Sequence, residues 1–472
     1  MKKTLAGFKD KTFLMTILTL ILPIALQNLI SSSLNMVDNV MIGKLGESSI
    51  AAVGLVNQYF FIFMLCLSGI NAGAGIFISQ FWGRKDVKNI RRMLGLQLIL
   101  STLVAIGFGL VAFLSPESII RVFTKDLEVI ALGSSYIRVI SITFLISSVS
   151  MAYSTVLRCM GIAKAPMYGS LIGVLANAFL NWVLIFGNLG FSAQGVVGAA
   201  IATSIARVIE VTYILFASYR SNEVIRCKVR EMFKFNKGFI GAYFKTSSAV
   251  MINEIVWALG ISTYSIIYAR IGIREVASMQ IANTVNNLFM VFGIGLASAG
   301  AIIVGNKIGQ GKPEEAIDYA KRLGILAPLI GIISGAALYA GAPYIVNIFN
   351  IEANTVKMTI GVLKIMAVFA PLRFFNVLMI VGIFRGGGDT LYSMFLQLGT
   401  VWFYAIPVGA VGAIFFKLPL EQVFFLLLSE EIIKVAFEFS RFRSGKWMKN
   451  IDGTIEPAKP KEKVKHRVAE VH

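Results

Sequence analysis

The sequence predicts an all-α polytopic membrane protein, with twelve transmembrane helices in two pseudo-symmetric six-helix bundles around a central cavity. Composition is the first observation: the 472 residues are 56% hydrophobic and 15% charged, with a mean hydropathy of +0.75, whereas soluble chains carry about 25% charged residues. Apolar runs of about 20 residues also recur along the chain, and its two halves repeat each other. A soluble enzyme, a secreted protein and a disordered chain are therefore excluded.

The predicted helices are the apolar runs taken in order. They cover residues 13–43, 50–81, 91–114, 129–155, 163–187, 196–219, 239–269, 276–305, 322–346, 356–384, 390–414 and 419–440. Helices are preferred to a membrane barrel because the runs are continuously apolar, whereas barrel strands alternate every second residue. The start of the chain has no short apolar core ending in a small-residue cleavage site. We therefore expect it to be the cytoplasmic beginning of the first helix and not a signal peptide.

An internal repeat relates the two halves at an offset of about 226 residues. Asn57 in AAVGLVNQYF corresponds to Asn283 in ASMQIANTVN, and Gly83 corresponds to Gly309. Several matches at nearly one offset predict two parallel halves with their shared cavity near the membrane midplane. The predicted parts are an N-terminal six-helix bundle (1–219), a cytoplasmic linker loop (220–238), a C-terminal six-helix bundle (239–445) and a disordered cytoplasmic tail (446–472).

The net charge of +19 lies mainly in the joints between the apolar runs and in the tail. With the N-terminus inside, roughly 31 of the 44 basic residues fall on the cytoplasmic side and about 7 on the other, as the positive-inside rule requires. The charge therefore predicts a multi-pass protein of the plasma membrane with both termini cytoplasmic. Nucleic-acid binding is not expected, because the aromatic residues lie inside the apolar runs and not among the basic residues.

Several chemistries lack the residues that they need. The three cysteines show no paired spacing, and both histidines, His466 and His472, lie in the tail. The segment FRGGGDT has no following Lys-Ser/Thr of a nucleotide-binding loop. We therefore expect no ATP site, no cofactor and no enzymatic activity.

Asp38 is the one charged residue in a long apolar stretch, where a charge costs about 2.5 to 3.5 kcal/mol on insertion scales, so it needs partners from other helices. Asn177 and Asn181 share one helix face, as do Ala199 and Thr203. One carboxylate, amide and hydroxyl oxygens and a freed carbonyl of Ala199 would suit Na⁺, or would hydrogen-bond a protonated Asp38. The alternative is a buried aspartate satisfied by asparagines for helix packing alone.

The other polar residues of the spans have simpler interpretations. Arg207 and Glu210, three residues apart, are expected to pair. The group of Glu430, Glu431 and Lys434 is expected to pair within its own helix. Arg138 and Lys364, at equivalent repeat positions, are expected to anchor helix ends. Three amides are candidates for orienting a substrate, because amides in spanning helices face protein or water: Asn57, Gln280 and Asn283.

The order and spacing of several blocks resemble the multidrug and toxic compound extrusion (MATE) family over about residues 10–440. The blocks are LPIALQNL, MVDNVMIGKLG, ISQFWGRKD, LRCMGIAKAPM, ANAFLNWVLIFG, QGVVGAAIATSI and FRGGGDT. The resemblance implies an ion-coupled antiporter that exports amphiphilic cations by alternating access. It implies an ion site at Asp38, Asn177, Asn181 and Thr203, with the Ala199 carbonyl as a further ligand. Some family members carry aspartate where this chain has Asn181, which leaves the choice between Na⁺ and H⁺ open.

Glu254 matches an acidic position of NorM-like members of that family, which is associated with cation coupling or cationic substrate binding. Their acidic residue in the tenth helix has no counterpart here, since that region reads PLRFFN. The alternative for Glu254 is a structural ion pair with Arg373 or Lys245. We expect a monomer whose partners are membrane lipids and small organic cations. The rival function is a flippase or exporter of a lipid-linked or other anionic compound, which would need a strongly cationic cavity.

Overall fold

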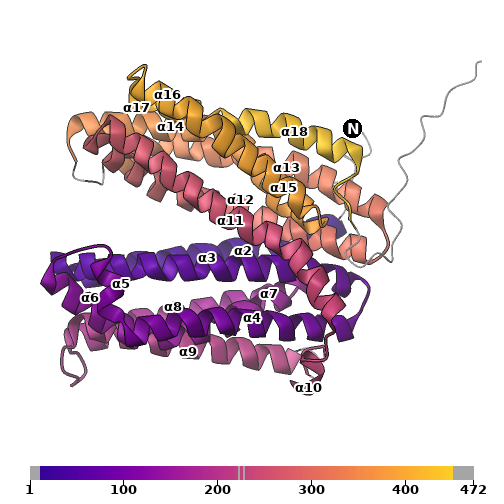
Figure 1. Ribbon diagram of the computed structural model, residues 1–472, viewed down its shortest axis with the longest axis horizontal. Helices are drawn as coiled ribbons and strands as arrows, with labels where there is room; N and C mark the ends of the chain where they lie inside the picture. The colour runs from indigo at the N-terminus through magenta and orange to yellow at the C-terminus, as the bar shows by residue number, and fades with distance from the viewer. Residues whose placement is uncertain (1–10, 222–223, 227–228, 348, 350, 450–472) are drawn as a thin grey trace, which may run out of the picture.

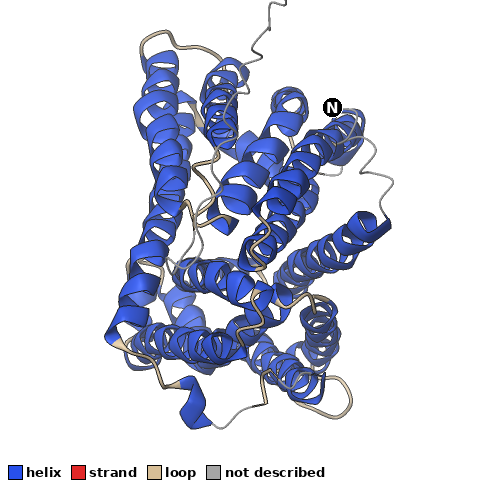
Figure 2. Cartoon of the chain, turned by 90° about the vertical axis from the view of Figure 1, so that its right-hand side faces the viewer, coloured by secondary structure: helices blue, strands red, loops and turns tan. Residues whose placement is uncertain are grey.

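The computed structural model describes residues 11–221, 224–226, 229–347, 349 and 351–449, and its described part is built from helices joined by short connections (Figures 1 and 2). Eleven of these helices are long and apolar enough to cross a membrane. Large apolar side chains such as Met15, Leu103, Phe113, Ile333 and Phe403 are more than half exposed on their outer faces. This surface suits lipid, so the predicted class of helical membrane protein is confirmed.

The first lobe contains the chain up to the basic linker (Figure 1). Its helices are α2 (Lys11–Gly43), α3 (Glu47–Gly83), α4 (Val87–Leu114), α5 (Pro116–Arg121), α6 (Leu127–Ile140), α7 (Ile142–Cys159), α8 (Lys164–Phe186) and α9 (Gly195–Ser221). The short α10 (Val229–Met232) lies in the linker and contacts α4, where Arg91 forms an ion pair of 2.9 Å with Glu231.

The second lobe repeats this order. Its helices are α11 (Lys237–Ile271), α12 (Ile273–Gly309), α13 (Pro313–Val346), α14 (Ala353–Val377), η2 (Leu378–Phe384), α15 (Thr390–Thr400), η3 (Val401–Ala405), α16 (Ile406–Ile414), α17 (Leu420–Leu428) and α18 (Glu430–Ser444). The segments η2 and η3 are π-helical turns that continue α14 and α15. Pro407 follows η3 and cannot donate a backbone hydrogen bond to the preceding turn, which accounts for the irregular winding there.

Two predicted helices are broken in the structure. The predicted run 129–155 is divided at Ser141, whose hydroxyl donates to the Arg138 carbonyl at 2.7 Å. The predicted run 419–440 is divided at Ser429, whose hydroxyl donates to the Leu426 carbonyl. In both places a serine side chain competes for backbone groups at the end of a helix. The twelfth span is therefore α17 followed by α18, each too short to cross a membrane alone.

The repeat is visible in the helix bounds. Both α3 and α12 contain 37 residues, and each is preceded by a glycine, Gly46 and Gly272. The equivalent residues Gly83 and Gly309 end these two helices. The two-lobe layout of twelve spans predicted from the sequence is confirmed.

The lobes meet through glycines of α3 and α12. A Cβ on Gly83 would overlap the Asn306 carbonyl oxygen, and a Cβ on Gly309 would overlap the Gln80 carbonyl oxygen. These two contacts are equivalent under the repeat, because Gln80 and Asn306 occupy matching positions of α3 and α12. The same relation links the contact of Gly69 with Met251 to that of Gly295 with Ala25, one on α11 and one on α2. The interface between the lobes thus has an approximate twofold axis.

The lobes converge toward the end where α10 lies and diverge toward the end of α5 and α16 (Figure 1). The hydrophobic core follows this shape. One apolar cluster includes Ile78 and Val304 from the two lobes, while three further clusters each lie within one lobe.

The predicted start of the disordered tail at residue 446 is wrong for residues 446–449. Trp447 is fully buried, its ring stacks on Phe442 with 5.6 Å between centroids, and it covers Gly387. Lys449 donates its backbone N–H to the Gly387 carbonyl at 2.7 Å and pairs with Asp389. Residues 450–472 lie outside the described part of the chain.

Candidate functional site

Asp38 lies on α2 and faces α8 and α9, the two helices that carry the predicted oxygen groups. The Asn181 amide donates from Nδ2 to Asp38 Oδ1 at 2.5 Å and to Asn177 Oδ1 at 2.9 Å. The Asn177 amide in turn donates to Thr203 Oγ1 at 3.1 Å. The structure therefore joins these four residues, from three helices, into one chain of hydrogen bonds.

The amides of this chain are completely buried, with 0% of Asn177 and of Asn181 exposed. Among the described residues, Asn181 Oδ1 has no hydrogen-bond partner, although it lies on the side chain that holds Asp38. A buried carbonyl oxygen without a donor is costly. The arrangement thus leaves one oxygen beside the Asp38 carboxyl able to accept a proton donor or to coordinate a cation.

Ala199 lies one turn before Thr203 on α9, and its side chain belongs to the apolar cluster of the first lobe, together with Ile42 and Val196. Tyr136 on α6 is buried next to Thr203 and within electrostatic range of Asp38. The sequence reasoning did not select Tyr136, because no spacing on α6 relates it to the residues of α2, α8 or α9.

A small polar pocket continues the site along α9. It is lined by Ser31, Ser170, Gly173, Val174, Asn177, Thr203, Ala206, Arg207 and Glu210. The predicted pair of Arg207 and Glu210 is confirmed at 2.7 Å, and Ser170 donates to Glu210 at 3.2 Å. Thr203, Arg207 and Glu210 recur at helical spacing on one face of α9, so the sequence contained a signal that this pair borders the site.

Glu254 on α11 forms an ion pair with Arg385, with 2.7 Å between Glu254 Oε1 and Arg385 Nη1. The predicted partners of Glu254, Arg373 and Lys245, are wrong. Arg373 instead donates to Asn286 at 3.1 Å and lies 4.0 Å from Glu431, while Lys245 is exposed. The structure places Glu254 in a largely buried ion pair within the second lobe and not in contact with the Asp38 group.

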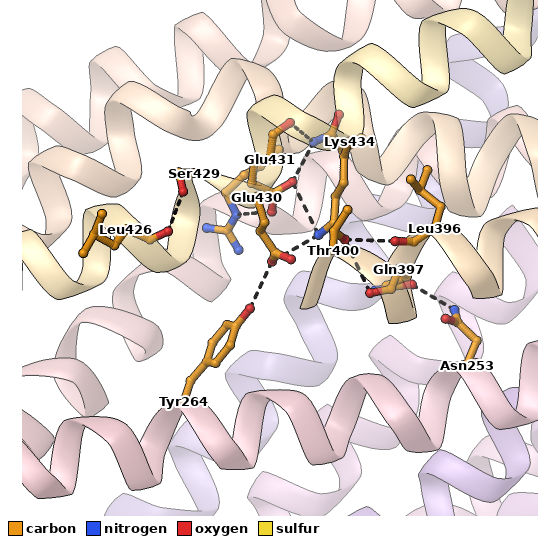
Figure 3. A network of polar contacts seen from close by, with 12 residues as sticks. Asn253, Tyr264, Leu396, Gln397, Thr400, Leu426, Ser429, Glu430, Glu431 and Lys434 are labelled. Atoms are coloured by element: carbon orange, nitrogen blue, oxygen red, sulfur yellow. Dashed lines mark hydrogen bonds and ion pairs between the residues drawn. The ribbon is translucent and has the colours of Figure 1, made fainter. Parts of the chain in front are cut away.

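The predicted pairing within the last helix is confirmed: Lys434 Nζ lies 3.1 Å from Glu430 and 3.9 Å from Glu431 (Figure 3). Groups from other helices join it. Tyr264 donates to Glu430 at 3.2 Å, and Asn376 donates to Glu431 at 2.6 Å. The cluster therefore bridges α11, α14 and α18.

The three candidate amides Asn57, Gln280 and Asn283 are exposed on α3 and α12. They do not line the polar pocket of the first lobe, nor the open groove that Ile365, Leu418 and Phe425 line beside α17. Their role toward a substrate stays a prediction, as does the central cavity.

The fold and the buried polar site define an integral membrane protein of two repeated six-helix lobes, a class to which membrane transporters belong. The chain belongs to the MatE family, whose family model matches residues 23–183 and 249–411, one block in each lobe. This confirms the resemblance that the sequence blocks predicted.

The relatives cover nearly the whole chain. A probable multidrug resistance protein NorM of Thermotoga maritima is 24% identical over 94% of this chain and 95% of its own. A solved outward-facing conformation of a multidrug resistance MATE family transporter has a TM-score of 0.83, at 20% identity over 91% of this chain and 95% of that chain. A MOP superfamily transporter from Pyrococcus furiosus, described as having a binding pocket of reversed polarity, has the same TM-score of 0.83. It is 20% identical and covers 92% of this chain and 96% of that chain.

Proposed function

We propose that this protein is a multidrug efflux transporter that exports amphiphilic, cationic organic compounds in exchange for Na⁺ or H⁺. The observation that carries the proposal is the hydrogen-bonded group of Asp38, Asn177, Asn181 and Thr203 inside the first lobe. Ionisable residues within spans mark ion pathways, and this carboxyl faces protein and not lipid. The similarity to the NorM protein of Thermotoga maritima supports the same function.

The coupling step would act on Asn181. In the described arrangement its Nδ2 donates to Asp38, and its own oxygen has no hydrogen-bond partner among the described residues. Coordination of Na⁺ requires oxygens toward the ion, so its entry would rotate the amide and turn Asn181 Oδ1 toward Asp38. Protonation of Asp38 would instead leave the amide in place and add a hydroxyl donor. Either event changes how α2 packs on α8, which is the local change that an exchange cycle needs.

Alternating access is part of the proposal. The close crossings of α3 with α11 and α12 support a closed end of the molecule near α10, and the lobes diverge at the other end (Figure 1). We place the closed end at the cytoplasm and both termini on that side of the plasma membrane, as the basic joints predict. Each positive charge that moves inward in excess of the charge exported releases about 2.3 kcal/mol per 100 mV, which supports more than tenfold accumulation of a substrate outside. No cofactor, ATP or partner protein is required.

The rival function is export of a lipid-linked or other anionic compound, which would need several free cations around the cavity. The described basic residues do not favour it. Arg207 and Arg373 are engaged with acidic or amide groups of their own lobes, and Lys364 lies 5.1 Å above the Tyr339 ring. Arg138 and Lys245 are exposed.

The test is reconstitution of the purified protein in liposomes with separately imposed Na⁺ and H⁺ gradients, a panel of fluorescent organic cations and a lipid-flipping assay. We expect gradient-driven export of cations that Asp38→Asn abolishes while folding is retained. Asp126→Asn is the matched control, because Asp126 is an exposed residue that caps the start of α6 and asparagine is an equally good cap. Wild-type export rates by Asp38→Asn would show that Asp38 does not couple transport, and lipid flipping without cation export would favour the rival function.

A further inference from the structure

The cluster on α18 contains a carboxyl that the proposed function does not use. Glu430, Lys434 and Glu438 follow one another at one-turn intervals on one face of α18, and they are 5%, 5% and 0% exposed. Lys434 therefore stands between two carboxyls on its own helix. Four buried or nearly buried ionisable groups, including Glu431, occupy the inner half of the twelfth span.

The first two carboxyls each have hydrogen-bond and ion-pair partners, although Glu430 Oε2 has none among the described residues (Figure 3). Glu430 accepts from Tyr264 at 3.2 Å and pairs with Lys434 at 3.1 Å. Glu431 accepts from Asn376 at 2.6 Å and has Lys434 at 3.9 Å and Arg373 at 4.0 Å. The ammonium of Lys434 is thus directed toward the beginning of α18.

Glu438 is different, because neither of its oxygens has a hydrogen-bond partner among the described residues. Its electrostatic neighbours are Lys434, Glu431 and Tyr392. Arg441, one turn further on, pairs with Asp389 at 2.7 Å, and Lys449 pairs with the same Asp389. Arg441 and Lys449 are therefore already engaged elsewhere.

In the part of the chain that the structure describes, the elements packed on α18 bring no further cation to Glu438. From α11 come Tyr264 and Tyr268, and from α14 come Arg373 and Asn376, all near Glu430 and Glu431. From α15 comes Tyr392, whose hydroxyl donates to the Phe437 carbonyl at 3.0 Å. From η3 comes Tyr404, whose hydroxyl shares a hydrogen bond of 3.1 Å with Ser429.

We propose that Glu438 carries a proton in this conformation, so that the α18 cluster is a proton-binding site of the second lobe, separate from Asp38. An ionised carboxylate that is fully buried and unpaired is so costly that it takes up a proton instead. A metal ion is a poorer occupant because the Lys434 ammonium already fills the position between the carboxylates. In addition, no three acidic, Cys or His side chains of the described residues gather to hold a metal.

Lys434 gives the site two states, since Glu430 lies one turn before it and Glu438 one turn after it. When Glu438 loses its proton to water at the end of α18, its carboxylate can take the ammonium of Lys434. The ammonium of Lys434 has then moved away from Glu430, and Glu430 takes up a proton from water. The total charge of the cluster is unchanged. The two carboxyls are about 12 Å apart along the helix, so this exchange moves a proton site over that distance.

The test is infrared spectroscopy of the purified full-length protein, which detects the C=O stretch of protonated carboxyl groups. It is performed on the Asp38→Asn background, so that Asp38 does not contribute. We expect Glu438→Gln to remove one protonated carboxyl per molecule and Glu117→Gln to remove none, because Glu117 is an exposed carboxylate paired with Arg121. Equal carboxyl signals before and after Glu438→Gln would overturn the proposal.

A second variant covers the case in which Glu438→Gln does not fold. Lys434→Gln removes the ammonium that keeps Glu430 ionised, and we expect it to add one protonated carboxyl per molecule. An unchanged signal would equally overturn the proposal.

The spectra do not require transport, so this inference and the proposed function can fail separately. One further expectation about Glu438 does rest on the proposed function. In liposomes, Glu438→Gln should change the dependence of export on a pH gradient and leave any dependence on a Na⁺ gradient unaltered.

Discussion

Asn181 occupies the central position among the residues of the site, because its one amide group contacts both Asp38 and Asn177. The residue types and their helical spacing were sufficient to predict that Asp38, Asn177, Asn181 and Thr203 belong together. The sequence was not sufficient to predict which atoms pair. Nor could it identify the partner of Glu254, since Arg385 comes from a turn more than a hundred residues away and several cations were equally plausible.

Replacing Asn181 by leucine should destabilise the protein by about 1–3 kcal/mol, because Asn177 Oδ1 and Asp38 both lose a buried donor. The measurement is the thermal unfolding midpoint in detergent. Asn57→Ala serves as the control, since Asn57 is exposed and its removal should change the free energy of unfolding by less than about 0.5 kcal/mol. Equal midpoints for the two variants would mean that the amide of Asn181 does not stabilise the buried chain.

The Glu254–Arg385 pair offers a way to separate structure from coupling. The side chain of Glu254 is 19% exposed and that of Arg385 is 7% exposed. Glu254→Gln therefore leaves a nearly buried guanidinium without its carboxylate and should lower the free energy of unfolding by roughly 3–5 kcal/mol. The double variant Glu254→Gln with Arg385→Met should recover much of that stability and, if the pair is structural, the transport activity as well. Recovery of stability without recovery of export would instead assign Glu254 to the transport cycle.

For single helices, the length of an apolar run predicts well where a spanning helix lies, but it predicts poorly where that helix is interrupted. The predicted bounds of α3, of α9 and of the span formed by α15, η3 and α16 lie within a few residues of the observed ones, because lipid exposure demands a continuous apolar run. The breaks at Ser141 and Ser429 were missed, since a single serine in a spanning helix more often bonds back to its own helix without breaking it. The packed segment after α18 was missed because its two apolar residues, Trp447 and Met448, stand between lysines and run directly into the lysine-rich sequence that follows.

That segment yields a prediction by truncation. Removing residues 450–472 should leave thermal stability unchanged, whereas removing residues 445–472 should lower it by about 3–5 kcal/mol, the usual cost of losing a buried tryptophan such as Trp447. Trp447→Ala alone should reproduce most of this loss. The comparison is made by thermal unfolding in detergent, and equal stability of the two truncated proteins would show that the packing of Trp447 contributes little.

For the whole molecule, the repeat predicted two lobes correctly, because equivalent sequence blocks fold into equivalent helices. How the lobes meet was not predictable from the repeat. It depends on glycines whose missing side chains allow backbone contact, and these glycines are scattered among many others in the sequence. The matching contacts of Gly83 and Gly309 therefore had to be seen in three dimensions.

Substituting these glycines tests whether the crossing of α3 and α12 closes one end of the transporter. In Gly83→Ala or Gly309→Ala the new methyl group would overlap the backbone of the other lobe, so we expect the lobes to separate at this end. Spin-label distances between the ends of α3 and α12 should lengthen or broaden, and the export rate should fall. Gly54→Ala is the matched control on α3, because nothing lies within 4 Å of a Cβ placed there. If the distances in Gly83→Ala match those in Gly54→Ala, this crossing is not the closure.

The approximate twofold axis between Gly83 and Gly309 makes the chain comparable to a homodimer whose subunits have been fused. In a true homodimer every substitution appears twice, so both copies keep the same interior. Fusion removes that restriction: the surfaces on the axis must still fit each other, but each interior can diverge alone. One copy carries a single carboxyl among amides at Asp38, and the other carries a lysine between glutamates on α18. The two repeated halves thus hold different buried ionisable groups within one polypeptide.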